Sequence, residues 1–113
     1  MTFFNTTNLT GKALISAIES SNSQDARVIK YFMSHTIGWL LGFSPSQVWS
    51  SEFDKAPLTS IRRTITNLTN CGYLIKTERQ VEGFYGKLEY VWKLAPPYKS
   101  DAMILRRIKR QNN

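Results

Sequence analysis

Cysteine and histidine are almost missing from this chain of 113 residues, which holds one of each. A single cysteine, Cys71, excludes an internal disulfide. Cys71 and His35 together also fall short of the four ligands that a structural zinc site takes from such residues. His35 follows an apolar helix face, which is more typical of a helix end than of a catalytic histidine. We therefore expect no metal ion and no cofactor.

Motifs for catalysis are missing as well. The chain has no glycine-rich phosphate loop with its lysine and no dinucleotide fingerprint. Its carboxylates are scattered, and we expect those of the predicted hairpin on its exposed face. The three tryptophans (Trp39, Trp49 and Trp92) stand in apolar contexts and are expected in the core. No catalytic residue is predicted, and we do not expect an enzyme.

Long apolar runs are also absent. The most apolar stretch, TIGWLLGF at 36–43, is far short of the roughly 20 residues that a membrane helix needs. The first residues, MTFFNTTNLTG, have neither the basic start nor the apolar run of a signal peptide. We expect no contact with membranes and a cytoplasmic location.

Acidic residues are scarce in the second half of the chain. The formal net charge of the whole chain is +7. Residues 1–54 hold three basic and four acidic residues, a net of −1, whereas residues 55–113 hold twelve basic and four acidic residues, a net of +8. Such an asymmetry favours a surface for a polyanion, most often nucleic acid. A surplus that only confers solubility would give the same numbers.

Helical periodicity and capping signals predict an α+β protein that is mainly α. Five helices are expected. The first covers 10–21, and the second runs from a cap at Ser23 to near His35. The third follows a capping box of Ser44, Pro45 and Gln47, the fourth covers 58–70, and the fifth follows a cap at Ser100. TIGWLLGF is bounded by glycines, so we interpret it as a buried connector or a short strand. The expected organisation is an N-terminal extension (1–22), a central domain (23–95) and a basic C-terminal helix or tail (96–113).

After Gly72 the apolar period changes from helical to two. YLIKTERQV and LEYVWKL predict two strands, joined by EGFYGK as a loop of more than two residues. In the second strand, the four residues predicted to form a buried face are Leu88, Tyr90, Trp92 and Leu94.

The segment 58–70, LTSIRRTITNLTN, has two contrasting sides. On a helical wheel, one sector holds the apolar residues Leu58, Ile61, Ile65 and Leu68. The opposite side holds Thr59, Ser60, Arg63, Asn67 and Asn70, with Arg62 and Thr66 on one flank. Ordinary solvated faces favour Glu and Lys at salt-bridging spacing, whereas this helix has neither. Arginine and asparagine can pair with guanine and adenine in the major groove, so we prefer a DNA-reading surface to a solvated face.

The order of helix, tight turn, helix, glycine and hairpin is that of a winged helix-turn-helix. SPSQVW resembles the first helix of the turn pair. PLTSIRRTITNLTNCGYLIKT is similar to a recognition helix that runs into a Gly-x-Leu wing strand, and EGFYGKLEYVWKL resembles the wing and its return strand. Over about Ser23 to Leu94, the chain thus resembles small winged-helix transcriptional regulators of phages or other mobile elements.

The resemblance implies a three-helix core with a hairpin wing and binding to specific sequences of double-stranded DNA. It also implies a location in the bacterial cytoplasm or nucleoid, either of the protein's own cell or of a host infected by a phage. The groove contacts that it assigns are Thr59, Ser60, Arg62, Arg63, Thr66 and Asn67. The wing contacts are Arg79, Tyr85 and Lys87, although Glu78 and Glu82 nearby would repel phosphate if they faced it. An alternative for Phe84 and Tyr85 is packing over the hairpin itself.

The basic tail, with Arg106, Arg107, Lys109 and Arg110, is open to three interpretations. It is a dimerisation helix that uses Ile104, Leu105 and Ile108, an additional phosphate-binding arm, or a solvated end. The resemblance favours a homodimer, because related regulators pair through terminal helices on palindromic sites.

Two other functions are compatible with the same pattern. A protein-interaction adaptor or inhibitor can be built on a winged helix, although it does not explain the charge of +8. An accessory protein of DNA replication or recombination would use the same surface as a regulator.

Overall fold

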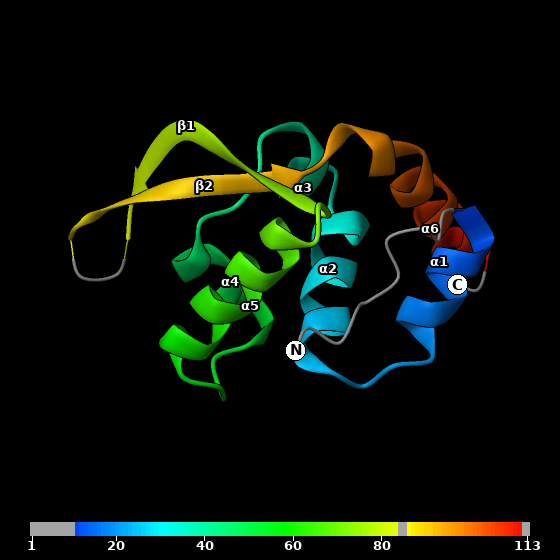
Figure 1. The fold of residues 1–113 in the computed structure, drawn as a ribbon, viewed down its shortest axis with the longest axis horizontal. Helices are drawn as coiled ribbons and strands as arrows, with labels where there is room; N and C mark the ends of the chain where they lie inside the picture. The colour runs from blue at the N-terminus through cyan, green and yellow to red at the C-terminus, as the bar shows by residue number, and fades with distance from the viewer. Residues whose placement is uncertain (1–10, 84–85, 112–113) are drawn as a thin grey trace.

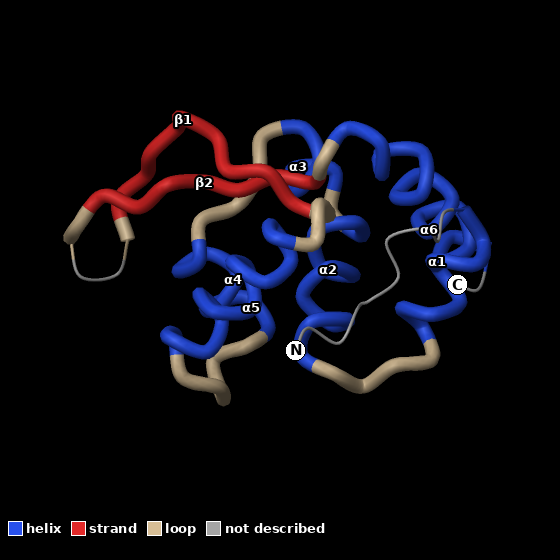
Figure 2. Tube along the Cα trace, in the orientation of Figure 1, coloured by secondary structure: helices blue, strands red, loops and turns tan. Residues whose placement is uncertain are grey.

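The computed structural model describes residues 11–83 and 86–111, with the side chains of all of these except residues 11–14, 36 and 106–111. The elements in chain order (Figure 1; Figure 2) are α1 (Gly11–Glu19), α2 (Gln24–Ser34), α3 (Thr36–Leu40), α4 (Pro45–Glu52), α5 (Leu58–Asn70), β1 (Leu74–Glu82), β2 (Leu88–Leu94), the 3₁₀ turn η1 (Pro96–Tyr98) and α6 (Lys99–Gln111). The predicted architecture, α+β and mainly helical with one hairpin after several helices, is confirmed.

Helix α2 lies at the centre of the molecule. Its first turn is capped as predicted, because the Ser23 side chain accepts a hydrogen bond from the Ala26 N–H. The four apolar residues predicted for its inner side are fully buried: Val28, Ile29, Phe32 and Met33. Helix α5 packs on one side of α2, and α1 and α6 pack on the other (Figure 1). One hydrophobic core therefore includes residues from both terminal helices and from the central ones.

The start of α4 matches its sequence signals. The Ser44 side chain accepts from the Gln47 N–H, and the Gln47 side chain accepts from the Ser44 N–H, which completes a capping box. Pro45 occupies the first helical position, where its missing N–H is not needed. These bonds therefore fix where α4 begins.

The prediction for TIGWLLGF is wrong, because Thr36–Leu40 form the short helix α3. Only Phe43, beyond the helix, pairs with a strand, as an isolated bridge to Trp92. Helix α3 packs against α2 and β2, with the other side of the helix turned outward. The exposed fractions on that side are 54%, 55% and 56% for Ile37, Leu40 and Leu41. The apolar run therefore does not mark a buried segment.

The last helix also differs from its prediction. It begins at Lys99, directly after η1, so Ser100 lies inside the helix and is not its cap. Leu105 is fully buried, and Ile104 packs partly against the same core. Dimerisation through Leu105 is therefore a wrong expectation, since the chain's own α1 and α2 pack against α6. The side chain of Ile108 lies outside the described residues.

Strands β1 and β2 form an antiparallel hairpin that extends beyond the helices (Figure 1). Five residues separate the end of β1 from the start of β2, more than the two of a tight hairpin, as predicted. Lys76 pairs with Trp92, but the next pair is Gln80 with Tyr90. Three residues of β1 (77–79) thus lie opposite Val91 alone, which makes a bulge that bends the hairpin.

The predicted buried face of β2 is wrong for its outer half. Leu94 is fully buried, but Leu88 and Tyr90 are 66% and 41% exposed. Val91, from the opposite side of the strand, is fully buried instead. Because the strand bends at the bulge, a simple alternation of side chains does not predict which of them face the helices beyond that point.

Candidate nucleic-acid interface

Helix α5 has the predicted bounds, and its apolar side attaches it to the core. Ile61, Ile65 and Leu68 are fully buried or nearly so, while Leu58 in the first turn is half-buried. The opposite side of the helix therefore has a defined position relative to α2 and α4. Such a defined position is what a recognition surface needs.

The C-terminus of α5 turns directly into β1. The Tyr73 N–H donates to the Leu68 carbonyl and the Gly72 N–H to the Thr69 carbonyl, both at 3.0 Å. These two bonds form a Schellman motif, which requires a left-handed residue at its turn. Gly72 supplies it with φ +89°. The hairpin thus leaves α5 at a defined angle.

Part of the polar content of α5 serves the fold. The Gln24 Nε2 of α2 donates to the Thr64 hydroxyl at 2.7 Å and lies 2.9 Å from the Ser60 hydroxyl. Thr64 is buried and Ser60 is half-buried. Ser60, a predicted DNA contact, is therefore placed against α2, where its hydroxyl already has a partner.

The remaining predicted residues of the helix form a continuous surface, which we call the outer face of α5: Thr59, Arg62, Arg63, Thr66 and Asn67. Four of them are exposed and Asn67 is half-buried. The Thr66 hydroxyl donates to the Arg62 carbonyl at 3.0 Å, which leaves its oxygen free to accept. In the described part of the chain, Arg63 forms no ion pair. Its donors are available to a ligand.

Arg62 is held by a residue that the sequence did not single out. The Arg62 Nη2 lies 2.8 Å from an Oε of Glu89 on β2, and the exposed fractions of the two side chains are 51% and 9%. Glu89 also accepts from the N–H and the hydroxyl of Ser46 in α4. The expectation that the hairpin carboxylates are exposed is wrong for Glu89. No signal in the sequence marks it, since its contacts depend on the bend of the hairpin.

The hairpin places two of the three predicted wing contacts on the surface. Arg79 lies in the bulge of β1 and Lys87 at the end of the loop, and both are exposed. Tyr85 and its neighbour Phe84 lie outside the described residues. Glu78 and Glu82 are exposed on the same hairpin, so the hairpin presents both signs of charge.

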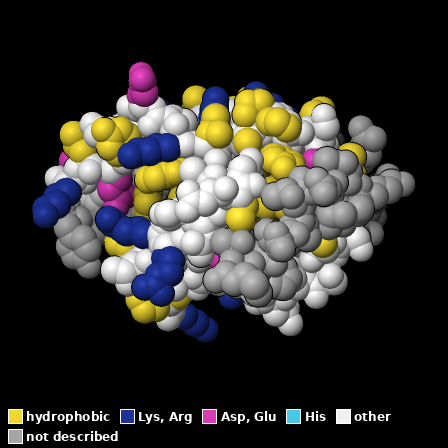
Figure 3. Space-filling view, in the orientation of Figure 1, with side chains coloured by type: hydrophobic (Ala, Val, Ile, Leu, Met, Phe, Trp, Pro, Cys, Tyr) yellow, Lys and Arg dark blue, Asp and Glu magenta, His cyan; other side chains and the backbone are white. Residues whose placement is uncertain are grey.

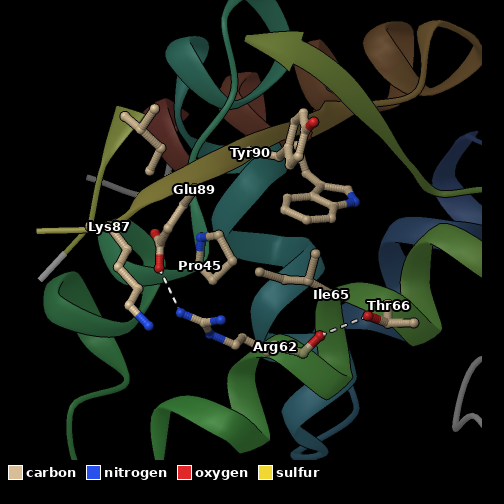
Figure 4. Close-up of a pocket in the computed structure, with 10 residues that line it drawn as sticks. Pro45, Arg62, Ile65, Thr66, Lys87, Glu89 and Tyr90 are labelled. Atoms are coloured by element: carbon tan, nitrogen blue, oxygen red, sulfur yellow. Dashed lines mark hydrogen bonds and ion pairs between the residues drawn. The ribbon is translucent and has the colours of Figure 1, made fainter. Parts of the chain in front are cut away.

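A groove of about 390 Å³ separates the outer half of the hairpin from α5 (Figure 4). Tyr90 approaches it from β2, and Ile65 and Thr66 approach from α5. Arg62, Lys87 and Glu89 lie at one end. On the hairpin, the Lys76 ammonium lies 4.0 Å from the centre of the Tyr90 ring, a cation–π contact.

Basic side chains gather on the side of the molecule that carries α4, α5 and the hairpin (Figure 3). Of the predicted tail contacts, Arg106, Arg107, Lys109 and Arg110 lie in α6, but their side chains are outside the described residues. In the described part of the chain, no group of His, Cys, Asp and Glu could hold a metal ion. None of the helices described is long and apolar enough to cross a membrane.

Comparison with known proteins gives no family for this chain. No family model matches it, and no curated protein and no solved structure is significantly similar to it. The function must therefore be argued from the residues of the interface.

Proposed function

We propose that this protein binds double-stranded DNA at specific sequences, as a small winged-helix transcriptional regulator. In this proposal α2, α4 and α5 are the helical core, α5 is the recognition helix and the β1–β2 hairpin is the wing. The protein acts by binding and not by catalysis.

The observation that carries the proposal is the outer face of α5. It presents two arginines, an asparagine and two threonines without any acidic residue in the helix. Arginine and asparagine can each form paired hydrogen bonds with a base edge, and threonine is short enough to allow close approach to the groove. A helix fixed on a core by its opposite side can present such a set in one orientation.

The arrangement around α5 supports the same function. Helix α4 precedes it after a short turn and packs against it. The hairpin extends from the other end of α5, with exposed Arg79 and Lys87 that can bind phosphate. The basic excess of residues 55–113 supplies the long-range attraction to DNA.

Selection of bound duplexes from a random library, with the purified protein, tests this proposal. We expect an enriched sequence whose affinity falls steeply as salt is added, because phosphate contacts release counterions. A palindromic consensus would indicate a dimer on the DNA. Absence of any salt-dependent affinity for duplex DNA would reject the proposal.

One observation favours a second candidate, the protein-interaction adaptor. Ile37 and Leu40 of α3, and Leu41 directly after it, each expose more than half of their surface, and exposed apolar clusters often mark protein contacts. Replacing all three by serine would leave DNA binding unchanged under the main proposal. An adaptor without DNA affinity would instead give no enriched duplex in the selection.

A further inference from the structure

Glu89 joins three parts of the interface. Its carboxylate accepts from the Ser46 N–H at 3.2 Å and from the Ser46 hydroxyl at 2.7 Å, both at the start of α4. The same carboxylate accepts from the Arg62 Nη2 at 2.8 Å (Figure 4). With 9% of its side chain exposed, Glu89 is enclosed by α4, α5 and the hairpin.

Gly83 provides the space for this carboxylate. A β-carbon at position 83 would lie 2.7 Å from Cδ and 2.9 Å from Oε2 of Glu89. Both distances are shorter than real contacts of this kind. Because the clash involves the end of a flexible side chain, an alanine at position 83 would displace the Glu89 carboxylate and leave every charge of the protein in place.

The ion pair changes what Arg62 can offer to DNA. A guanidinium has five N–H donors in a planar fork, and at least one of those of Arg62 points to Glu89. The adjacent carboxylate offsets the attraction of Arg62 to phosphate and holds its other donors in one orientation. Charge attracts any DNA backbone, whereas oriented donors distinguish base edges.

We propose that Glu89 determines specificity, by holding Arg62 as an oriented donor to a base and by suppressing its use as a general phosphate contact. This inference rests on the proposed function. Glu89 also occupies the N-terminus of α4, a position that would otherwise attract a phosphate. In this role Glu89 acts through Arg62 and Ser46, and it does not itself touch the DNA.

The test compares Glu89→Gln with Glu82→Gln, an exposed carboxylate of the same hairpin. Both variants lose one negative charge, and a glutamine at position 89 can still accept from Ser46. Affinities are measured for the selected duplex and for a scrambled one over a range of salt. The specificity ratio is the affinity for the selected duplex divided by the affinity for the scrambled one. For Glu89→Gln we expect tighter binding of the scrambled duplex, with a salt slope steeper by about 0.9. The specificity ratio should be lower by about tenfold. For Glu82→Gln the ratio should not change.

Two further variants complete the test. Gly83→Ala should lower the ratio as Glu89→Gln does, and it serves in its place if Glu89→Gln does not fold by circular dichroism. In an Arg62→Met background, Glu89→Gln should lower the ratio less than it does when Arg62 is present.

Some outcomes would overturn the inference alone. In the first, the wild-type protein selects a sequence, but the folded Glu89→Gln or Gly83→Ala variant keeps the wild-type specificity ratio. In the second, Glu82→Gln lowers the specificity ratio as much as Glu89→Gln does. A wild-type protein without salt-dependent affinity for duplex DNA would instead reject the proposed function itself.

Discussion

On the inner side of α5, Ile61 and Leu68 are fully buried and Thr64 is bonded to Gln24 of α2. On the outer side, Thr59 and Arg63 face solvent. The comparison shows that the polar residues of this helix have two different roles. Ser60 and Thr64 attach α5 to α2, and the outer face is left for a ligand. Changes on the two sides should therefore affect different measurements.

The largest effect is expected from Ile61→Ala on the inner side. Removal of a fully buried isoleucine side chain from the core should lower the free energy of unfolding by about 2–5 kcal/mol, through lost burial and a residual cavity. Urea denaturation measures this change in the free energy of unfolding. The matched control on the outer side, Thr59→Ala, should change stability by at most about 0.7 kcal/mol, in the stabilising direction. Similar losses in both variants would contradict the division of the helix into two sides.

Arg63→Ala on the outer side should give the opposite pattern. We expect about 1–3 kcal/mol of lost affinity for the selected duplex, relaxed specificity at one base pair, and unchanged stability. Lys87→Ala in the hairpin is the contrast. It should weaken all duplexes alike and reduce the salt slope by about one unit. A uniform loss in both variants would show that Arg63 contacts phosphate and not a base.

Gln24→Ala tests the attachment of the inner side of α5 to α2. Loss of the amide removes the donor to Thr64 and Ser60, and about 0.5–1.5 kcal/mol of stability should go with it. Gln80→Ala, at an exposed position of β1, is the control and should change stability by less than about 0.5 kcal/mol. The sequence preference for DNA should stay the same, because Ser60 is bonded to α2. A changed preference would show instead that Ser60 contacts DNA.

The smallest effect concerns the end of α5, where the buried Tyr73 ring lies 5.0 Å from the ring of Tyr98. Burial, and after it the Asp101 carboxylate, raises the pKa of Tyr98 above its ordinary value of 10.0. Above pH 10.0 the unfolded chain therefore releases this proton more readily than the folded one, and stability falls as the pH rises. Urea denaturation one pH unit below and one above that value should show a smaller fall for Tyr98→Phe than for wild type. Equal falls would show that Tyr98 does not contribute.

Local signals were enough to predict much of this fold. The caps at Ser23 and Ser44, the bounds of α5 and the turn at Gly72 depend on neighbouring residues alone, and the structure has each of them. The faces of the outer hairpin were not predictable in this way, because a bulge leaves no simple mark in the sequence. Helix α3 was missed because a short apolar run between glycines looks the same whether or not it is buried.

In the candidate site, too, the features that depend on neighbouring residues were predictable and those that depend on distant ones were not. The exposure of Arg62, Arg63 and Thr66 follows from helical periodicity, so the wheel predicted it. The partners of Ser60 and Arg62 come from α2 and β2, 36 and 27 residues away in the chain. Contacts at such separations depend on packing, which helical periodicity does not describe. Glu89 was missed for this reason.

The bulge at residues 77–79 has a consequence for the behaviour of the protein at high concentration. Both strands of a two-stranded sheet are edge strands, whose unpaired backbone groups can pair with another chain. The bulge interrupts the free edge of β1 in its middle, and the exposed Glu78 and Arg79 lie at that point. An incoming strand would find only short regular segments flanked by charge. We therefore expect the free edge of β1 to resist edge-to-edge aggregation, even though the hairpin extends beyond the helices.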